Sequence, residues 1–435
     1  MNEKKLKVLW ICHFSDIKIR DHINFAPLYF KKFLGIIKKR ETLEYRDTAV
    51  WVSNAIKEFE KYDDIDLTVV FPHLAINGTY QEFTNNKIHY KCFRSEDDCL
   101  VSFIKKRFFH KSEKIYRNNR RIISNFVKQI SPDIVHVIGA ENPYYSLSAL
   151  DIPKSIPVVV SLQTLMNDPT FRDNYNIDKD DYVYRSRIEA EVIKRSDYIA
   201  STVQNFKDYV KQYIKQDAIF LHMPLAVGQN VDLTPVDKEY DFVYFATNIA
   251  KTADYAIEAF ILACKRYPKL SLNLSGYCAP EYRLKLEAIL KEHGLVENVT
   301  FTGSQLTHED VIRQIKKSRF ALLPQKIDLI SSTIREAMAC GLPVVTTITP
   351  ATPGLNKDRE SILLSEKGDY QAMANNMLRL VNDDSFASII RENAIATVSE
   401  RYSNEKYMWI WKKNYYEIMK IFQKGMPSLE ESFSK

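Results

Sequence analysis

The sequence predicts two α/β domains, each with a parallel β-sheet covered by helices on both faces. Short apolar runs typical of buried strands alternate along the chain with longer amphipathic patterns, which indicates parallel sheets. A chain of 435 residues is also too long for one hydrophobic core. Residues 222–239 hold two prolines and one glycine without a clear period. They are the predicted linker between a first domain, 1–222, and a second domain, 223–404.

The first domain is predicted from buried strands and amphipathic helices. The strands are short apolar runs, and the helices carry apolar residues at a period near 3.6. His136 lies in the middle of one strand, where a packed core histidine is a better interpretation than a ligand. We expect strands at 5–12, 66–71, 133–140, 157–162 and 198–201, and helices at 49–61, 112–130 and 185–196.

The second domain repeats this alternation. Thr307 is expected to cap one of its helices, because two acidic residues follow in the first turn. The aromatic, amphipathic helix 405–422 is predicted to pack into a core, and residues 423–435 form a tail. We expect strands at 241–247, 270–275, 299–303, 320–323 and 343–346, and further helices ending near 267, following 307, and at 370–383 and 385–400.

The stretch 322–345 joins two of these strands through a loop and a helix. Asp328 precedes the helix, and Glu336 is expected in its first turn. A helix N-terminus offers unpaired N–H groups to a phosphate, and the carboxylates suit hydroxyls. The pattern therefore favours a nucleotide sugar, although a structural glutamate on the helix dipole explains it as well. The candidate N-cap residues are Ser331, Ser332 and Thr333.

This stretch resembles the donor-site signature of the retaining GT-B glycosyltransferases of family four. That signature is a Glu-x7-Glu pair that overlaps the pattern E-A-x-A-x-G-x-P-V-V. Asp328 stands where the family has its first glutamate, and the glycine-rich residues between the acids are replaced by LISST. The matching residues are Glu336, Ala337, Ala339, Gly341, Pro343, Val344 and Val345.

The resemblance implies a GT-B fold, with two Rossmann-like doubly wound domains facing across a cleft and the helix 405–422 returning to the first domain. It also implies transfer of a hexose from a nucleotide-diphosphate sugar to a glycan or lipid-linked acceptor, with retention, in polysaccharide biosynthesis. Under this interpretation Glu336 and Asp328 hold sugar or ribose hydroxyls. The nucleotide sugar is a co-substrate, and no other cofactor is expected.

Three further features depart from the family pattern. Gln163 follows the strand 157–162, where the family places a histidine near the transferred sugar, and glutamine cannot carry its charge. Lys251 fits the family lysine that grips the diphosphate, but the neighbouring arginine has no counterpart. The loop after the first strand lacks glycine, which argues against NAD or FAD. In the family this loop faces the acceptor, so four residues of the loop are candidates for acceptor contacts by position only, although each is more easily interpreted as a surface residue. They are His13, Asp16, Arg20 and His22.

No metal site is predicted. Two D-x-D patterns occur, at Asp64 and Asp66 and at Asp178 and Asp180, and neither follows a strand beside the donor signature. We therefore expect the leaving diphosphate to be stabilised by Lys251 and backbone N–H groups without a metal ion. Two alternatives stay open: a GT-B-fold epimerase acting on a sugar nucleotide, and a non-catalytic protein that binds one.

The amino-acid composition narrows the class of protein. Hydrophobic and charged contents are ordinary for a globular enzyme, and no run of 18 apolar residues exists to span a membrane. The first residues lack the features of a signal peptide, and the six cysteines show no metal-binding spacing. These features predict a cytoplasmic protein with reduced thiols.

The charge is unevenly distributed. Residues 1–220 carry 35 basic and 29 acidic side chains and 221–435 carry 26 of each, so the net +6 lies in the first half. Its densest part, 105–121, interleaves basic with aromatic residues. One interpretation of this run is a patch at the inner face of the membrane, which contacts anionic lipid headgroups or a lipid-linked acceptor. The other is a plain solvated helix face. Nucleic acid is less favoured, because no recognised module accompanies the run.

Overall fold

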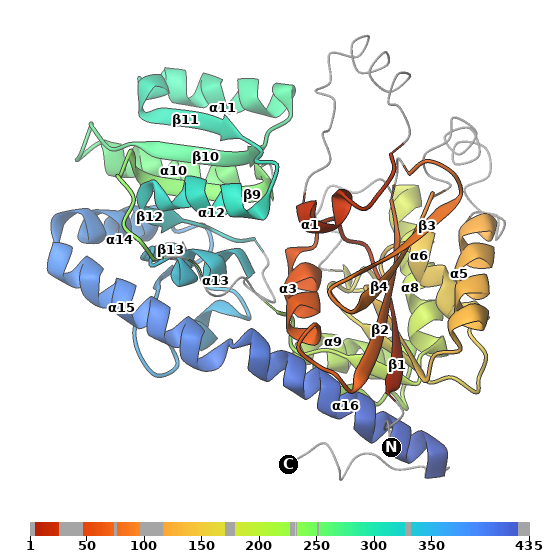
Figure 1. Ribbon diagram of the computed structural model, residues 1–435. Helices are drawn as coiled ribbons and strands as arrows, with labels where there is room; N and C mark the ends of the chain where they lie inside the picture. Colours follow the sequence, from red (N-terminus) through yellow and green to blue (C-terminus); the bar gives the residue numbers. More distant parts are fainter. Residues whose placement is uncertain are drawn as a thin grey trace. The chain divides into compact units, whose positions relative to one another are not determined.

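The computed structural model describes residues 5–25, 47–73, 76–95, 116–169, 179–226, 231, 233–249, 252–326 and 332–424. The chain forms two compact units. Unit 1 comprises Met1–Ala226 and Asn404–Lys435, and unit 2 comprises Val227–Ser403. Each unit is an α/β layer structure built on one sheet, which confirms the predicted fold class (Figure 1).

The sheet of unit 1 has eight strands in the order β3-β4-β2-β1-β5-β6-β7-β8, and all neighbours are parallel except β3 and β4. The central strand β1 pairs with β2 on one side and β5 on the other, with Val8 opposite both Leu67 and Ile134. The strands are β1 (Leu6–Ile11), β2 (Ile65–Pro72), β3 (Tyr80–Asn85), β4 (Ile88–Phe93), β5 (Ile134–Ile138), β6 (Val158–Ser161), β7 (Tyr198–Ala200) and β8 (Phe220–Leu221).

The hairpin β3–β4 is absent from the sequence prediction. Its two-residue turn, Asn86 and Lys87, has positive φ at both positions (47° and 69°), as a hairpin turn that matches strand twist requires. Side chains of β3 alternate between exposed and half-buried positions, so this strand lacks the apolar run that marks the buried strands.

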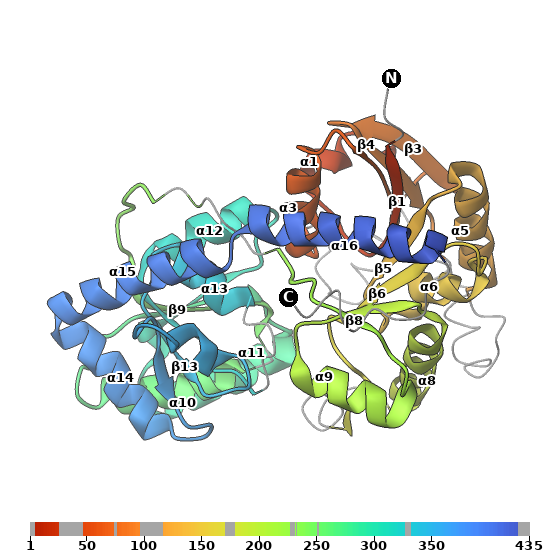
Figure 2. The same ribbon diagram turned by 90° about the horizontal axis from the view of Figure 1, so that it is seen from below.

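The helices of unit 1 include the last helix of the chain, α16, which returns to this unit as the resemblance implies. Figure 2 shows α16 running alongside this unit. Its buried residues Met408, Trp411, Tyr415 and Ile418 recur at three- and four-residue spacing and join the core of unit 1. The aromatic stripe is therefore core, as predicted. The helices are α1 (Ile17–Arg20), α3 (Val50–Phe59), α5 (Arg117–Ile130), α6 (Pro143–Ser146), α8 (Lys179–Arg195), α9 (Gln204–Tyr209) and α16 (Asn404–Lys424).

A buried hydrogen-bonded chain ties α16 to the sheet. Trp10 Nε1 donates to Tyr415 Oη at 2.9 Å, His136 Nδ1 lies 2.6 Å from the same hydroxyl, and His136 Nε2 lies 2.7 Å from Ser161 Oγ. Burial lowers the pKa of His136 to about 3, so its ring is neutral. His136 is a core histidine, as predicted.

The sheet of unit 2 is fully parallel, with six strands in the order β11-β10-β9-β12-β13-β14. In chain order this is 3-2-1-4-5-6, the arrangement of a nucleotide-binding doubly wound sheet. The strands are β9 (Tyr240–Asn248), β10 (Leu272–Tyr277), β11 (Val299–Gly303), β12 (Ser318–Leu322), β13 (Val344–Thr347) and β14 (Leu363–Ser365). The helices are α10 (Ala253–Cys264), α11 (Pro280–Glu292), α12 (His308–Lys316), α13 (Ser332–Ala339), α14 (Tyr370–Asn382) and α15 (Asp384–Arg401).

Helix ends in unit 2 follow the expected capping chemistry. Thr307 Oγ1 accepts a hydrogen bond from Asp310 N at 3.0 Å and caps α12. Gly341 ends α13 with φ +70° and donates to Met338 O, while Leu342 N donates to Ala337 O. One detail of the prediction is wrong: Glu336 is the fifth residue of α13 and lies beyond its first turn.

Candidate functional site

The carboxyl edge of the unit 2 sheet is the candidate ligand site. The strand order reverses between β9 and β12, and ligands of open α/β sheets bind beyond the strand ends at such a reversal. The loops that follow β9 and β12 lead into α10 and α13, so two helix N-termini belong to this edge. An anionic group is favoured there by the helix dipoles and the first N–H groups.

Packing fixes which side chains α13 turns away from the core. Ile334, Ala337 and Met338 are fully buried at three- and four-residue spacing. Glu336 lies off this stripe, and its side chain is 17% exposed. Ser332 and Thr333 begin the helix and are half-buried. The three predicted residues therefore stand on one short helix that the core holds in place.

Glu336 has a partner that the sequence did not indicate. His308 Nε2 lies 3.2 Å from Glu336 Oε1, and its side chain is 21% exposed. His308 is the first residue of α12, directly after the Thr307 cap. The imidazole fixes one carboxylate oxygen, and Glu336 Oε2 accepts no hydrogen bond from the described residues. That oxygen can accept a hydrogen bond from a ligand hydroxyl.

The loop after β12 brings a cation to the start of α10. Thr347 Oγ1 binds both Gln325 N (2.8 Å) and Gln325 O (2.7 Å), so the loop is tied to the end of β13. From this base Lys326 extends over the ring of Tyr255, with Nζ 5.0 Å from the ring centre. Tyr255 lies in the first turn of α10. Lys326 therefore adds positive charge to the N-terminus of this helix.

A close backbone approach shapes the neighbouring strand end. Gly276, in β10, has φ +137°, and a Cβ there would collide with the carbonyl oxygen of Ala246 in β9. Only glycine fits this position. The ends of β9 and β10 are thereby drawn together beside the loop that leads to α10.

The remaining predicted residues of unit 2 fall outside the described part of the chain. They are Asp328, Lys251 and Ser331. Their roles stay predictions.

Gln163 belongs to unit 1 and follows the end of β6 by two residues. It is half-buried, and the segment after it is held by the fully buried Glu189 of α8. This carboxylate accepts hydrogen bonds from Met166 N (3.0 Å), Asn167 N (2.9 Å) and Asn167 Nδ2 (2.8 Å). Burial raises the pKa of Glu189 to about 7. The strand end that carries Gln163 is therefore well fixed.

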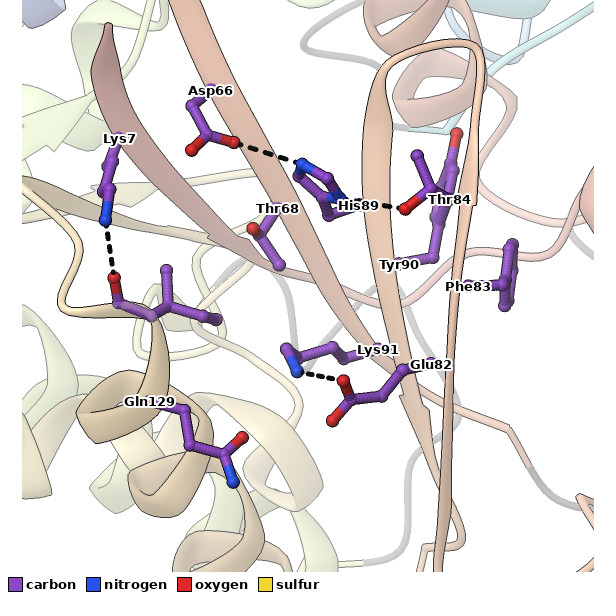
Figure 3. Close-up of a pocket in the computed structure, with 11 residues that line it drawn as sticks. Lys7, Asp66, Thr68, Glu82, Phe83, Thr84, His89, Tyr90, Lys91 and Gln129 are labelled. Atoms are coloured by element: carbon purple, nitrogen blue, oxygen red, sulfur yellow. Dashed lines mark hydrogen bonds and ion pairs between the residues drawn. The ribbon is translucent and has the colours of Figure 1, made fainter. Parts of the chain in front are cut away.

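A cavity of about 420 Å³ lies elsewhere in unit 1, against β2, β3, β4 and α5 (Figure 3). Two pairs of its polar side chains lie close together. His89 Nε2 lies 3.5 Å from Asp66, and Lys91 Nζ lies 2.6 Å from Glu82. None of the predicted site residues lines this cavity. We therefore do not assign it a ligand.

The first D-x-D pattern is engaged in unit 1, and Asp178 of the second lies outside the described residues. Asp64 binds Lys412 Nζ at 2.7 Å and Tyr416 Oη at 3.0 Å, which fastens α16 to the end of the loop before β2. Asp66 faces His89. Within the described ranges, no group of three or more His, Cys, Asp or Glu is placed to hold a metal ion.

Only the end of the basic run 105–121 is described. There Arg120 pairs with Asp151 through two hydrogen bonds of 2.5 and 2.6 Å, so its charge is neutralised. The residues 105–115 lie outside the described part. Among the helices that the structure describes, none has the length and apolar content needed to cross a bilayer.

Comparison with known proteins gives a family match within unit 2. Residues 232–397 match the family described as glycosyl transferases group 1. Solved structures share the architecture of the whole chain. Sucrose-phosphate synthase from Thermosynechococcus elongatus matches with a TM-score of 0.66 and 15% identity, over 96% of this chain and 100% of that one. The chain has the GT-B fold, and its second unit matches the model of the glycosyl transferases group 1 family. The recognition made from the sequence is confirmed at this level, and membership of family four stays a prediction.

Further matches include one more solved structure and two curated proteins. A trehalose-6-phosphate protein structure from E. coli, bound with UDP-2-fluoro glucose, has a TM-score of 0.62 and 11% identity over 94% of this chain and 98% of that one. The N-acetyl-alpha-D-glucosaminyl L-malate synthase of Bacillus anthracis is 25% identical over 34% of this chain and 37% of its own length. An uncharacterized glycosyltransferase of Methanocaldococcus jannaschii is 22% identical over 51% and 60%. These alignments span less than two thirds of the curated relatives.

Proposed function

We propose that this GT-B protein transfers a hexose from a nucleotide-diphosphate sugar to a glycan or lipid-linked acceptor, with retention and without a metal ion. The observation that carries the proposal is the His308–Glu336 pair on the edge of the group 1 domain. It offers a fixed carboxylate that faces the first residue of α12 and stands on the same helix as Ser332 and Thr333. A sugar diphosphate needs both kinds of contact, because it carries anionic oxygens at one end and hydroxyls at the other.

In this proposal Glu336 accepts hydrogen bonds from ribose or sugar hydroxyls, and His308 orients it. Asp328 binds hydroxyls of the transferred hexose, and Gln163 contributes a neutral contact to that sugar. The N–H groups around Ser331, Ser332 and Thr333, together with Lys251, receive the charge that develops on the leaving diphosphate. Charge stabilisation by these groups takes the place of a metal ion.

Lys326 supplies a second cation in place of the family arginine that this chain lacks. The expected arginine after β9 is missing, yet Lys326 reaches the start of α10 from the loop after β12. A lysine acts on a phosphate as a point charge and needs no fixed fork geometry, so it can come from either side of the site. We therefore assign it to the donor diphosphate.

Structures of related fold support the ligand class. Anabaena HepE is known in complex with UDP and glucose and matches this chain with a TM-score of 0.59. The E. coli relative is bound with UDP-2-fluoro glucose. These ligands belong to those proteins, and they make UDP-sugars the first donors to test, followed by GDP- and ADP-sugars.

The test is thermal shift with this donor panel, followed by calorimetric titration of Glu336→Gln and Glu309→Gln. A bound donor raises the melting temperature by mass action. We expect Glu336→Gln to weaken donor binding about tenfold to a hundredfold, since hydrogen bonds to a charged acceptor contribute about 1.5–3 kcal/mol. Glu309 is exposed beside His308 and serves as the matched control. Unchanged affinity and turnover in Glu336→Gln would reject the assignment.

Lys326→Met is tested against Lys265→Met, because Lys265 is exposed at the other end of α10. We expect weaker binding of the UDP-sugar and of UDP in Lys326→Met, with less effect on the free sugar.

Two incubations separate the alternative functions. Isomerised donor after incubation without an acceptor indicates an epimerase. Donor that binds but is not turned over in any acceptor mixture indicates a non-catalytic binder.

The acceptor side includes a proposed contact with an anionic membrane surface through 105–121. Liposome co-sedimentation with Lys105, Lys106 and Arg107 reversed tests it. We expect binding to anionic vesicles to fall with the reversal and with added salt. Equal binding by the reversed variant would leave this run as ordinary surface.

A further inference from the structure

The loop that follows β6 is fastened to the two helices that come after it in the chain. The carboxyl of Glu189 in α8 accepts from Met166 N, Asn167 N and Asn167 Nδ2 at 3.0, 2.9 and 2.8 Å. Asn167 Nδ2 also donates to Ser186 O at 2.6 Å, and Tyr209 Oη of α9 donates to Asn167 O at 2.7 Å. One loop residue is thus held by its N–H, its carbonyl and its side chain. These contacts are named the Asn167 clamp.

The Asn167 clamp sets the path of the chain at Gln163. Before Gln163, Leu162 N donates to Ala200 O at 3.0 Å and so continues the pairing of β6 with β7. After it, the clamp begins at Met166, only three residues later. Leu165 and Met166 are fully buried, whereas Gln163 is half-buried. The position of Gln163 therefore depends on contacts that neighbouring residues make.

Glu189 is the titratable group at the centre of the clamp. Burial raises its pKa, the three donors lower it, and the charge of Glu141 raises it, which together give a pKa of about 7. Arg185, one turn earlier on α8, donates to Glu141 O at 2.9 Å. Other charged or titratable groups act on Glu141 or on the clamp hydroxyl of Tyr209. They are Arg185, Asp168, Tyr182 and Tyr213.

Opening of the clamp is linked to ionisation of Glu189. When the loop leaves α8, water reaches the carboxyl and its pKa returns towards the ordinary 4.5. The clamped form therefore binds the proton more tightly, and a rise in pH between these two pKa values favours the opened form. Because Leu165 and Met166 are buried, the opened form is a minor population. Its ratio to the clamped form is what the pH changes.

We propose that Glu189 is a positioning residue for Gln163, which holds the loop after β6 in its clamped form and releases it more often as the pH rises. In this role Glu189 contacts no substrate and acts through the loop backbone. That Gln163 contacts the transferred sugar rests on the proposed function. The clamp and its response to pH do not depend on it.

Hydrogen–deuterium exchange of the loop, followed by mass spectrometry on the full chain at pH 6, 7 and 8, tests the clamp without a ligand. Protection factors, corrected for the intrinsic exchange rate at each pH, report the ratio of opened to clamped forms. We expect protection of the Met166 and Asn167 amides to fall about tenfold between pH 6 and pH 8, as the two pKa values require. In Glu189→Gln we expect the same protection at all three pH values.

Two matched variants separate the carboxyl from the rest of the fold. Tyr209→Phe removes one hydrogen bond of the clamp and no charge, so protection should fall at every pH and keep its tenfold change. Asp197 accepts from Val158 N at 2.9 Å at the other end of β6, and Asp197→Asn should leave the loop as in the wild type. Wild-type protection that does not change with pH, or a change that persists in Glu189→Gln, would overturn the proposal.

A double-mutant cycle on the transfer reaction tests whether the clamp acts through Gln163. We expect Glu189→Gln to lower kcat several-fold, with donor affinity unchanged, and to have no further effect in a Gln163→Ala background. An equal loss in both backgrounds would mean a general structural role and would reject Glu189 as a positioning residue. Absence of transfer with every donor and acceptor would instead sink the proposed function, and the exchange result would then decide the clamp by itself.

Discussion

Substitution of Tyr415 by phenylalanine tests how α16 is locked onto unit 1. A tryptophan N–H can only donate, so Tyr415 Oη accepts from Trp10 and gives its own proton to His136 Nδ1. The proton on the histidine then lies on Nε2 and is donated to Ser161 Oγ at 2.7 Å. One hydroxyl thus connects α16 with β1, β5 and β6.

The magnitude follows from the atoms left behind. Tyr415, Trp10 and His136 are fully buried, so water cannot replace the lost hydroxyl. Tyr415→Phe leaves the Trp10 N–H and His136 Nδ1 without partners, and each such group costs about 1–3 kcal/mol. We therefore expect the free energy of unfolding of unit 1 to fall by roughly 3 kcal/mol or more.

Urea denaturation followed by tryptophan fluorescence measures this change. The chain has four tryptophans, Trp10, Trp51, Trp409 and Trp411, and all lie in unit 1, so the signal reports that unit alone. Tyr416→Phe is the matched control on the same helix, because its partner Asp64 keeps Lys412. We expect the control to cost less than about 1 kcal/mol. Equal costs for the two variants would refute the buried network as the lock.

Three further predictions concern the rest of the fold. Gly276→Ala forces a Cβ onto the carbonyl of β9 and should destabilise unit 2 by about 2–3 kcal/mol, seen by circular dichroism without a matching change in tryptophan fluorescence. Burial raises the pKa of Glu189 from 4.5 to about 7, so the folded chain keeps a proton that the unfolded chain releases. Stability from this group is full below pH 4.5 and is lost as the pH rises through 7, by up to about 3 kcal/mol, and urea titrations of Glu189→Gln should show a flatter profile. Lys412→Met breaks the half-exposed pair with Asp64 and should cost only about 0.5 kcal/mol in the same assay, with no further loss when Asp64→Asn is added.

Features carried by local pattern could be predicted from the sequence. The apolar runs and the glycine of the stretch 322–345 predicted a strand, a helix and a second strand. The structure has β12, α13 and β13 there. The core role of His136 followed from its place in an apolar strand. In both cases the deciding information lies within a few neighbouring residues.

Features that depend on distant contacts could not be predicted. The His308–Glu336 pair joins residues 28 apart, and nothing near His308 marks it except its place directly after the Thr307 cap. Lys326 could be assigned to the site only from its contact with Tyr255, which belongs to another strand–helix connection. The strand β3 is missed for another reason: its half-exposed side chains carry no apolar run, and its turn uses Asn86 and Lys87 without glycine.

The two sheets place chemically different groups at corresponding positions. Both have a strand-order reversal, between β1 and β5 in unit 1 and between β9 and β12 in unit 2. The edge in unit 2 gathers charge, since Lys326 stands at a helix N-terminus and Glu336 is kept partly exposed. The edge in unit 1 buries its groups, and burial raises the pKa of Glu141 to about 7 and lowers the pKa of His13. Burial costs a permanently charged ligand far more than a hydroxyl. The same topology therefore carries a charged edge in one unit and a buried edge in the other, and burial rather than strand order makes the difference.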